Sequence, residues 1–224
     1  MKYIYHHLGL GDHLICNGLV RSVVKPNEQY ILFVKPHNRV TVEFMYRDLP
    51  NLKVYEADDN GVNNYFRNNK IQGSDVIVGG FRQFPGARCF DESFYIQNNI
   101  PFENKWTHFK VQRDLDSEQK LFNKFNVKPK EYIFIHDDER YRVDLNRVEN
   151  NHLPIVKCEK GHTENLFDYL MLVENALACH TIESSLQFII DSLNLNPENY
   201  VHRYARPVEP WSTPIYKNVK QIIQ

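Results

Sequence analysis

Short apolar segments of strand length alternate with helix-length segments through most of the chain, and this alternation limits the possible folds more than any other feature. The predicted strands of the first half cover residues 2–6, 29–35, 52–57 and 75–78. Those of the second half cover residues 132–136, 153–158, 179–182 and 200–202. Because strands separated by helices form parallel βαβ units with right-handed crossovers, the sequence predicts an α/β protein with parallel sheets.

Helices are predicted where apolar residues recur at helical spacing. Asp12 is expected to be the N-cap of the first one. Further helices are predicted over residues 37–49, 165–178 and 186–193, and a short final one over 216–223.

The chain changes character near its middle. Residues 90–113 are aromatic and irregular, with short helices expected, and a polar helix over 114–127 follows. We therefore predict two small Rossmann-like domains, 1–114 and 115–224, facing a central cleft. The aromatic residues are interpreted as core or inter-domain packing, although aromatic rings can also stack on sugars or bases: Phe94, Tyr95, Phe102, Trp106 and Phe109.

Composition excludes several classes of protein. The 224 residues carry 27 Lys and Arg against 28 Asp and Glu, so no nucleic-acid partner is expected. No apolar run approaches the roughly 18 residues of a membrane span, and the apolar stretch near the N-terminus is too short to predict a signal peptide. The four cysteines are widely separated, which favours neither a zinc site nor disulfides. We expect a soluble, cytoplasmic protein.

The first candidate site is Gly9-Leu10-Gly11-Asp12-His13, between a strand and a helix. Glycines allow a tight turn and close approach of a ligand, and the helix N-terminus favours an anion. However, an acidic residue there would repel a pyrophosphate. Asp12 is better suited to accept a proton from a hydroxyl group, unless the motif is only a turn with a helix cap.

The second candidate site is the loop His136-Asp137-Asp138-Glu139-Arg140-Tyr141-Arg142, at the carboxyl end of a predicted strand. Ligands bind at that edge of open α/β sheets. The acidic residues with His136 could bind a metal, although consecutive side chains diverge. Arg140 and Arg142 could instead bind phosphates, or the loop could be merely solvated.

The third candidate site is Thr181-Ile182-Glu183-Ser184-Ser185, which leads into a helix. Hydroxyl residues at such a turn can form a phosphate cradle, although they are also ordinary helix caps. Its position strengthens the first interpretation, because this turn and the 137–142 loop can share one edge of the same sheet.

Together these motifs resemble glycosyltransferases of the two-Rossmann, GT-B type, and the similarity is greatest to the heptosyltransferase-like group. There the Asp after the Gly-X-Gly turn is the proposed base toward the acceptor hydroxyl, which corresponds to Asp12. Residues 176–185 resemble the segment under the donor diphosphate, although Glu183-Ser184-Ser185 stands where that group has Asp-(Thr/Ser)-Gly. The His136 loop is loosely similar to the His-x-Arg-x-x-Asp loop of some fucosyltransferases, with its Arg two positions late. Typical members are longer.

The resemblance implies a metal-independent enzyme that moves a sugar from a nucleoside diphosphate sugar to a hydroxyl of a glycan or glycolipid, with no other cofactor. Asp12 and His13 are the predicted catalytic residues. The predicted donor-binding residues are Gly9, Gly11, His136, Asp138, Arg140, Arg142, Glu183, Ser184 and Ser185. Two alternatives stay open: a catalytically silent nucleotide-binding module of the same fold, and a metal-dependent hydrolase built on His136, Asp137 and Asp138. The sequence leaves the oligomeric state open.

Overall fold

The computed structural model describes residues 1–81, 83–159, 161–206 and 209–224. The chain divides into two compact units. Unit 1 consists of Met1–Gln112 and Glu209–Ile215, and unit 2 of Arg113–Val208 and Tyr216–Gln224. The first passage between the units lies two residues before the division predicted at 114/115. The return of Glu209–Ile215 to unit 1 has no counterpart in the sequence-based prediction.

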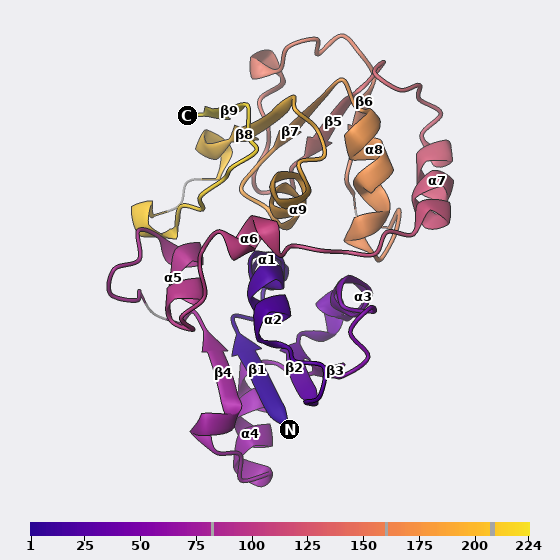
Figure 1. Ribbon diagram of the computed structural model, residues 1–224. Helices are drawn as coiled ribbons and strands as arrows, with labels where there is room; N and C mark the ends of the chain where they lie inside the picture. The colour runs from indigo at the N-terminus through magenta and orange to yellow at the C-terminus, as the bar shows by residue number, and fades with distance from the viewer. Residues whose placement is uncertain (82, 160, 207–208) are drawn as a thin grey trace. The chain divides into compact units, whose positions relative to one another are not determined.

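Unit 1 contains a four-stranded parallel sheet in the order β3-β2-β1-β4 (Figure 1). All four predicted strands are confirmed, with ends shifted by at most one residue: β1 (Lys2–His6), β2 (Tyr30–Val34), β3 (Leu52–Glu56) and β4 (Val76–Gly79). The connecting helices are α1 (Leu10–Ile15), α2 (Asn17–Val23), α3 (Arg39–Met45), α4 (Asp59–Asn68), α5 (Phe90–Ile96) and α6 (Asn104–Thr107). Short 3₁₀ turns cover Pro36–Asn38, Gly73–Asp75 and Pro210–Ser212.

Two predicted helices of unit 1 have other boundaries. The first begins at Leu10 and is interrupted at Cys16, so Gly9 is the N-cap and Asp12 lies within the first turn. The helix expected over 37–49 ends at Met45, because residues 46–49 form tight turns before Pro50.

One face of the unit 1 sheet is packed by α4. Val62 of α4 is fully buried against Tyr3 and Phe33, and the rings of Tyr65 and Phe66 meet the same strand residues edge-on or tilted. Since side chains alternate along a strand, Ile4 and Leu32 are buried on the opposite face.

The aromatic connecting region belongs to the core of unit 1. Phe94 and Tyr95 are both 0% exposed, and the Tyr95 hydroxyl donates to the carbonyl of Ile15 over 2.6 Å. Phe109 is 8% exposed, and Phe102 packs against Trp106 with ring centroids 5.1 Å apart. These contacts favour the packing interpretation over a ligand platform.

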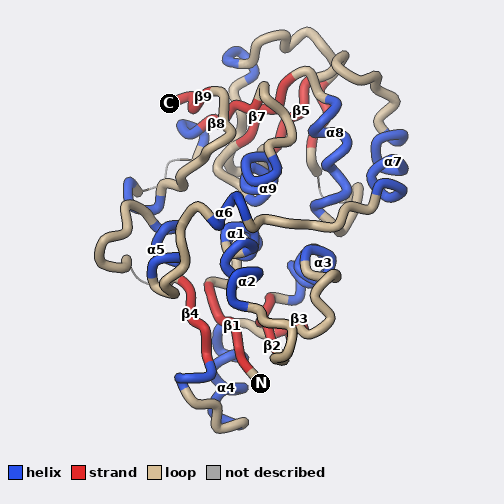
Figure 2. Tube along the Cα trace, viewed as in Figure 1, coloured by secondary structure: helices blue, strands red, loops and turns tan. Residues whose placement is uncertain are grey.

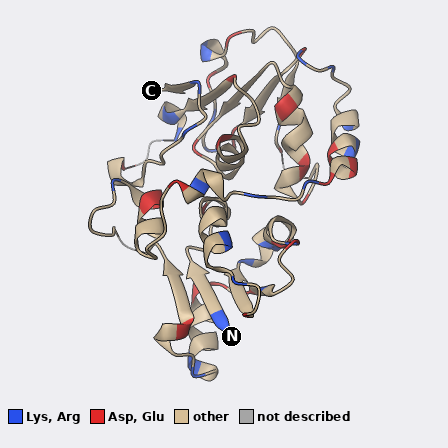
Figure 3. Ribbon diagram, viewed as in Figure 1, with Lys and Arg blue, Asp and Glu red and all other residues tan. Residues whose placement is uncertain are grey.

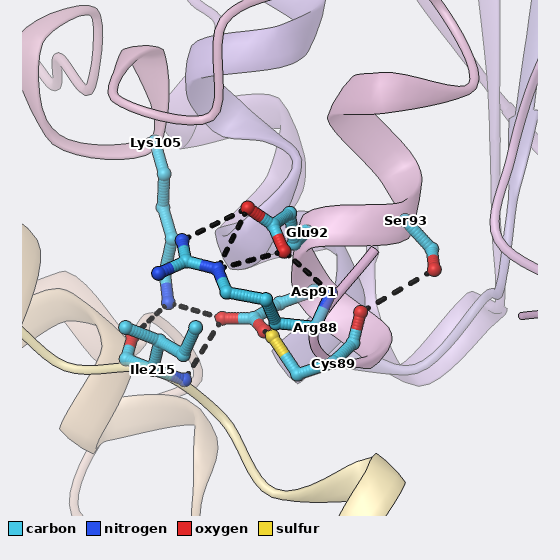
Figure 4. Close-up of polar contacts among 7 residues, drawn as sticks. All are labelled: Arg88, Cys89, Asp91, Glu92, Ser93, Lys105 and Ile215. Atoms are coloured by element: carbon cyan, nitrogen blue, oxygen red, sulfur yellow. Dashed lines mark hydrogen bonds and ion pairs between the residues drawn. The ribbon is translucent and has the colours of Figure 1, made fainter. Parts of the chain in front are cut away.

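A buried ion pair attaches Glu209–Ile215 to the rest of unit 1 (Figure 4). The ammonium of Lys105, in α6, donates to the carboxylate of Asp91, in α5, and to the carbonyl of Ile215. The same carboxylate accepts the N–H of Ile215. Both polar backbone groups of Ile215 are thus satisfied inside unit 1.

Unit 2 contains a five-stranded parallel sheet in the order β6-β5-β7-β8-β9. Figure 2 shows its strands in red and its helices in blue. The strands are β5 (Ile133–His136), β6 (Ile155–Lys157), β7 (Ala178–Thr181), β8 (Asn199–His202) and β9 (Gln221–Ile223). The helices are α7 (Leu115–Lys124), α8 (Leu170–Asn175) and α9 (Ser185–Leu193), with 3₁₀ turns over Leu145–Arg147, Leu166–Tyr169 and Arg203–Ala205.

The prediction of a final helix over 216–223 was wrong. Gln221, Ile222 and Ile223 instead pair in parallel with Tyr200, Val201 and His202 of β8. The free edge of β8 would otherwise present unpaired backbone groups, and β-branched residues suit a strand. The helix predicted over 165–178 also exists only in part, as a 3₁₀ turn followed by α8.

The core of unit 2 lies against the central strands. Ile133 and Ile135 of β5 pack with Val143, Val148 and Ile182. Among the described residues, no helix is long and apolar enough to cross a membrane. Lys and Arg as well as Asp and Glu occur on helices and loops (Figure 3), and their numbers give a formal net charge of −1.

Candidate active site

The strand order of unit 2 creates a topological switch point between β5 and β7. The chain leaves β5 toward β6 on one side and leaves β7 toward β8 on the other. Loops that diverge in this way open a crevice at the carboxyl ends of the strands, where α/β proteins bind ligands. Two of the predicted site motifs follow β5 and β7 directly.

The structure brings these two motifs together through His136 and Ser184. The Ser184 hydroxyl oxygen lies 2.8 Å from Nδ1 of His136, and the N–H of Ile182 donates to the His136 carbonyl. Burial lowers the pKa of His136 to about 4, so the imidazole is neutral at neutral pH. His136 therefore fixes the orientation of the Ser184 side chain without adding charge.

The N-terminus of α9 directly follows this turn, with Ser184 in front of the first helical residue. Ser184 is the N-cap residue, with extended backbone, but its side chain makes no capping hydrogen bond. The first N–H groups of a helix have no partner within the helix and carry a partial positive charge. Ser184 and Ser185 stand at this end of α9, as the sequence predicts.

Glu183 does not have the predicted donor-binding position. Its carboxylate is 4% exposed and accepts hydrogen bonds from Nε of Arg203, over 2.7 Å, and from the Tyr216 hydroxyl. A buried carboxylate already paired with a guanidinium cannot contact a phosphate. Its role is to anchor Arg203 and Tyr216 beneath the turn.

Arg206, which the sequence reasoning did not single out, lies beside the same turn. Its Nη1 donates to the carbonyl of Glu183, directly before the N-cap of α9. The Arg206 guanidinium also lies 5.5 Å from the centroid of the Tyr141 ring, and that of Arg140 lies 5.1 Å from it. Arg206 follows β8 at the same edge of the sheet, and this position in the sequence could have indicated that it lies near the two motifs. Arg142 is exposed on the loop.

The acidic residues of the β5 loop do not converge on a common point. Asp137 pairs with Lys157 over 3.0 Å and accepts the N–H of Val143, whereas Asp138 accepts the N–H groups of Arg140 and Tyr141. Asp138 therefore shapes a turn, which corrects its assignment as a donor ligand. Within the described parts of the chain, no three His, Cys, Asp or Glu residues are grouped to hold a metal.

The sheet of unit 1 has its own switch point, between β1 and β4. Asp12 lies just beyond β1, in the first turn of α1, and its carboxylate folds back over Gly9. A Cβ atom at Gly9 would lie only 2.5 Å from Oδ2 of Asp12, so a side chain there would displace the Asp12 carboxylate. Gly11 lies inside α1 rather than in the turn, which removes it from the predicted binding loop.

The Asp12 carboxyl has a pKa of about 7, well above its ordinary value. Burial raises the pKa most, while backbone N–H groups of Asp12 and Gly9 and the charge of Lys35 lower it. A half-buried carboxyl that titrates near neutrality has the property of a general base.

His13 is not placed for catalysis. Its side chain is 0% exposed, and its ring centroid lies 4.5 Å from that of the equally buried His6. Burial, and then the neighbouring His6, hold the pKa of His13 well below its ordinary value. The structure therefore gives no support to the predicted catalytic role of His13, because the residue after Asp12 on the helix points into the core.

The whole chain is similar in structure to a solved protein described as "The crystal structure of the glycosyl transferase family 9 from Veillonella parvula DSM 2008". The likeness has a TM-score of 0.62 at 9% sequence identity and covers 100% of this chain and 86% of that one. The fold is GT-B-like. No protein-family model matches this GT-B-like chain, and no curated protein matches it by sequence.

Proposed function

We propose that this chain is a glycosyltransferase that moves a sugar from a nucleoside diphosphate sugar to a hydroxyl group of a glycan or glycolipid acceptor. The observation that carries the proposal is Asp12: a half-buried carboxyl with a pKa of about 7 at the switch point of a sheet. The GT-B-like fold and the resemblance of the Gly-X-Gly-Asp motif support the same reaction class.

In the proposed reaction Asp12 acts on the acceptor. Its carboxylate takes the proton of the acceptor hydroxyl as that oxygen bonds to the anomeric carbon of the donor sugar. The bond from that carbon to the diphosphate breaks, and the electron pair leaves with the diphosphate. Because the pKa of Asp12 is near 7, a large fraction of the enzyme holds the carboxylate at neutral pH while the carboxylate stays basic enough to accept a proton.

Unit 2 is assigned to the donor. The departing diphosphate would be met by the N–H groups at the start of α9, the hydroxyls of Ser184 and Ser185, and the guanidinium of Arg206. Preorganised donors of this kind stabilise charge that develops on a leaving group. We propose that they make a metal ion unnecessary.

The two alternatives are not equally supported. The hydrolase would need His136, Asp137 and Asp138 to share a ligand, whereas their hydrogen bonds lead to Ser184, Lys157 and the 140–141 backbone. A silent nucleotide-binding module would use the same α9 terminus, so only turnover distinguishes it from the enzyme.

The test begins with thermal shift measurements against UDP, GDP, CDP and ADP in EDTA. The nucleotide that stabilises the protein selects the sugar nucleotides whose hydrolysis and transfer are then measured. Asp12→Asn is expected to lower turnover by a factor of about 10² to 10⁴ while leaving nucleotide binding unchanged.

Glu43→Gln serves as the control, because Glu43 is 44% exposed in its side chain and lies in α3 of the same unit. Nucleotide binding without any turnover would favour the silent module. An Asp12→Asn variant that keeps more than a tenth of the wild-type rate would overturn the role of Asp12. Activity lost in EDTA would overturn the metal-independent mechanism.

A further inference from the structure

Phe81 has an unusual backbone conformation at the carboxyl end of β4. Its φ angle is +66°, directly after Gly80 at +81°. Two consecutive residues in the left-handed region are uncommon, and a bulky aromatic residue there is strained. Gly80 is required for this turn, because a Cβ atom would lie 2.3 Å from the Phe94 ring and 2.8 Å from the His7 ring.

The strained backbone is held by His7, the first residue after β1. The N–H of Phe81 donates to Nε2 of His7 over 2.9 Å. The Phe81 ring lies 4.3 Å from the His7 ring and 4.8 Å from the Tyr5 ring, measured between centroids. The two strands that flank the switch point of unit 1 are therefore joined by this contact, and it fixes the Phe81 ring.

Despite these contacts the Phe81 side chain is 41% exposed. Packing of the hydrophobic core does not explain why a large aromatic residue has a strained backbone and an exposed side chain. Backbone strain of this kind is concentrated at ligand-binding sites. The same turn includes Asp12, because its carboxylate folds back over Gly9, only two residues after His7.

We propose that Phe81 is the platform on which a sugar ring of the acceptor stacks beside Asp12, an inference that rests on the function proposed above. The C–H face of a pyranose is apolar and fits an aromatic ring, whose polarised face attracts it. A rigid platform at this switch point would present a hydroxyl of that sugar to the carboxylate. The site would select acceptors that carry a pyranose next to the reacting hydroxyl.

Ligand-observed saturation-transfer NMR tests the proposal without turnover. The probes are millimolar methyl β-glucopyranoside, methyl β-galactopyranoside and methyl α-mannopyranoside. We expect saturation of the C–H face of at least one glycoside, a loss of affinity of about tenfold in Phe81→Gly, and retained binding in Phe81→Trp. Tyr55→Ala is the control, because Tyr55 is a similarly exposed ring, at 44%, on edge strand β3.

Thermal stability separates a binding role from a structural one. Glycine adopts positive φ without strain, so Phe81→Gly is expected to lower the Tm by no more than about 2 °C or to raise it. Unchanged glycoside binding in Phe81→Gly, equal loss in Tyr55→Ala, or no saturation of any glycoside by the wild type would each overturn the platform. Nucleotide binding by unit 2 is measured separately, so these results would leave the proposed transfer reaction standing.

Discussion

The Nζ atom of Lys105 lies 2.6 Å from Oδ2 of Asp91, and neither side chain has any exposed surface. Lys105 donates a hydrogen bond to the carbonyl of Ile215, and Asp91 accepts one from its N–H. Ile215 belongs to the segment 209–215, which is part of unit 1 although it follows most of unit 2 in the sequence. The Lys105–Asp91 pair is therefore the polar anchor of a long-range connection rather than a surface ion pair.

Replacing Lys105 by Met is expected to lower the free energy of unfolding by about 3 to 5 kcal/mol, because it leaves the Asp91 carboxylate buried without its cation. The double variant Lys105→Met/Asp91→Asn should recover part of that loss. Urea denaturation measures both, and limited proteolysis should show new cleavage within 209–215.

Lys2→Met is the control for this pair. Lys2 and Asp75 form an ion pair of 2.9 Å, but their side chains are 36% and 41% exposed, so the loss should stay below about 1 kcal/mol. Equal losses in Lys105→Met and Lys2→Met would contradict the anchoring role.

Asp12 should make the protein less stable as the pH rises. Its folded-state pKa is about 7 against an ordinary value of 3.8, so the folded protein keeps a proton that the unfolded chain has released in that range. The free energy of unfolding should fall between pH 4 and pH 7. Above pH 7, Asp12→Asn should be more stable than the wild type by about 1 to 2 kcal/mol, since partial exposure reduces the full effect.

Denaturation curves at pH 4.5 and pH 8 measure this difference. Glu43→Gln is the control for this comparison, because Glu43 is an exposed carboxylate of the same unit. If the free energy of unfolding changed with pH in the same way for the wild type and for Asp12→Asn, the Asp12 carboxyl would not be desolvated.

Substitutions of Arg206 and Arg203 should have different effects, the first mainly on phosphate binding and the second on stability. Arg206→Gln is expected to weaken binding of the preferred nucleoside diphosphate about tenfold with only a small fall in Tm, because a charged hydrogen bond to phosphate is lost. Arg203→Gln should lower stability by about 2 kcal/mol, since Arg203 is ion-paired with the buried Glu183. Calorimetric titration and thermal unfolding provide the two readouts. Identical nucleotide affinity in Arg206→Gln and the wild type would remove Arg206 from the donor site.

Gly18 should tolerate no side chain. A Cβ atom at this position of α2 would lie 1.9 Å from the backbone carbonyl oxygen of Asn104, which belongs to α6 and cannot move alone. Gly18→Ala is expected to cost about 3 kcal/mol or more. Gly73→Ala, where a Cβ atom meets nothing within 4 Å, should change stability by less than about 0.5 kcal/mol. Equal denaturation midpoints for the two variants would contradict the close approach of α2 and α6.

The local pattern of apolar residues determined the strands and the fold class. The eight predicted strands form because a short apolar segment is buried, and pairing with neighbouring strands gives hydrogen-bond partners to its backbone N–H and C=O groups. The same pattern put the His136 loop and the Ser184 turn at one sheet edge, and the hydrogen bond between them confirms that placement.

The pattern of residue types could not predict where individual side chains of the first motif lie. Asp12 was expected at the N-cap, yet Gly9 occupies that position, and the Asp12 carboxylate folds back over the glycine. Burial then raises the pKa of this carboxyl. His13 was expected at the site and is core, because adjacent residues on a helix face different directions.

Only the tertiary structure decided the long-range features: the pairing of β9 with β8, the return of 209–215 to unit 1, and the positions of Arg206 and Phe81. Each depends on partners far away in the sequence. Local propensity cannot encode such contacts, since their free energy comes from burial and hydrogen bonds that exist only once the chain has folded.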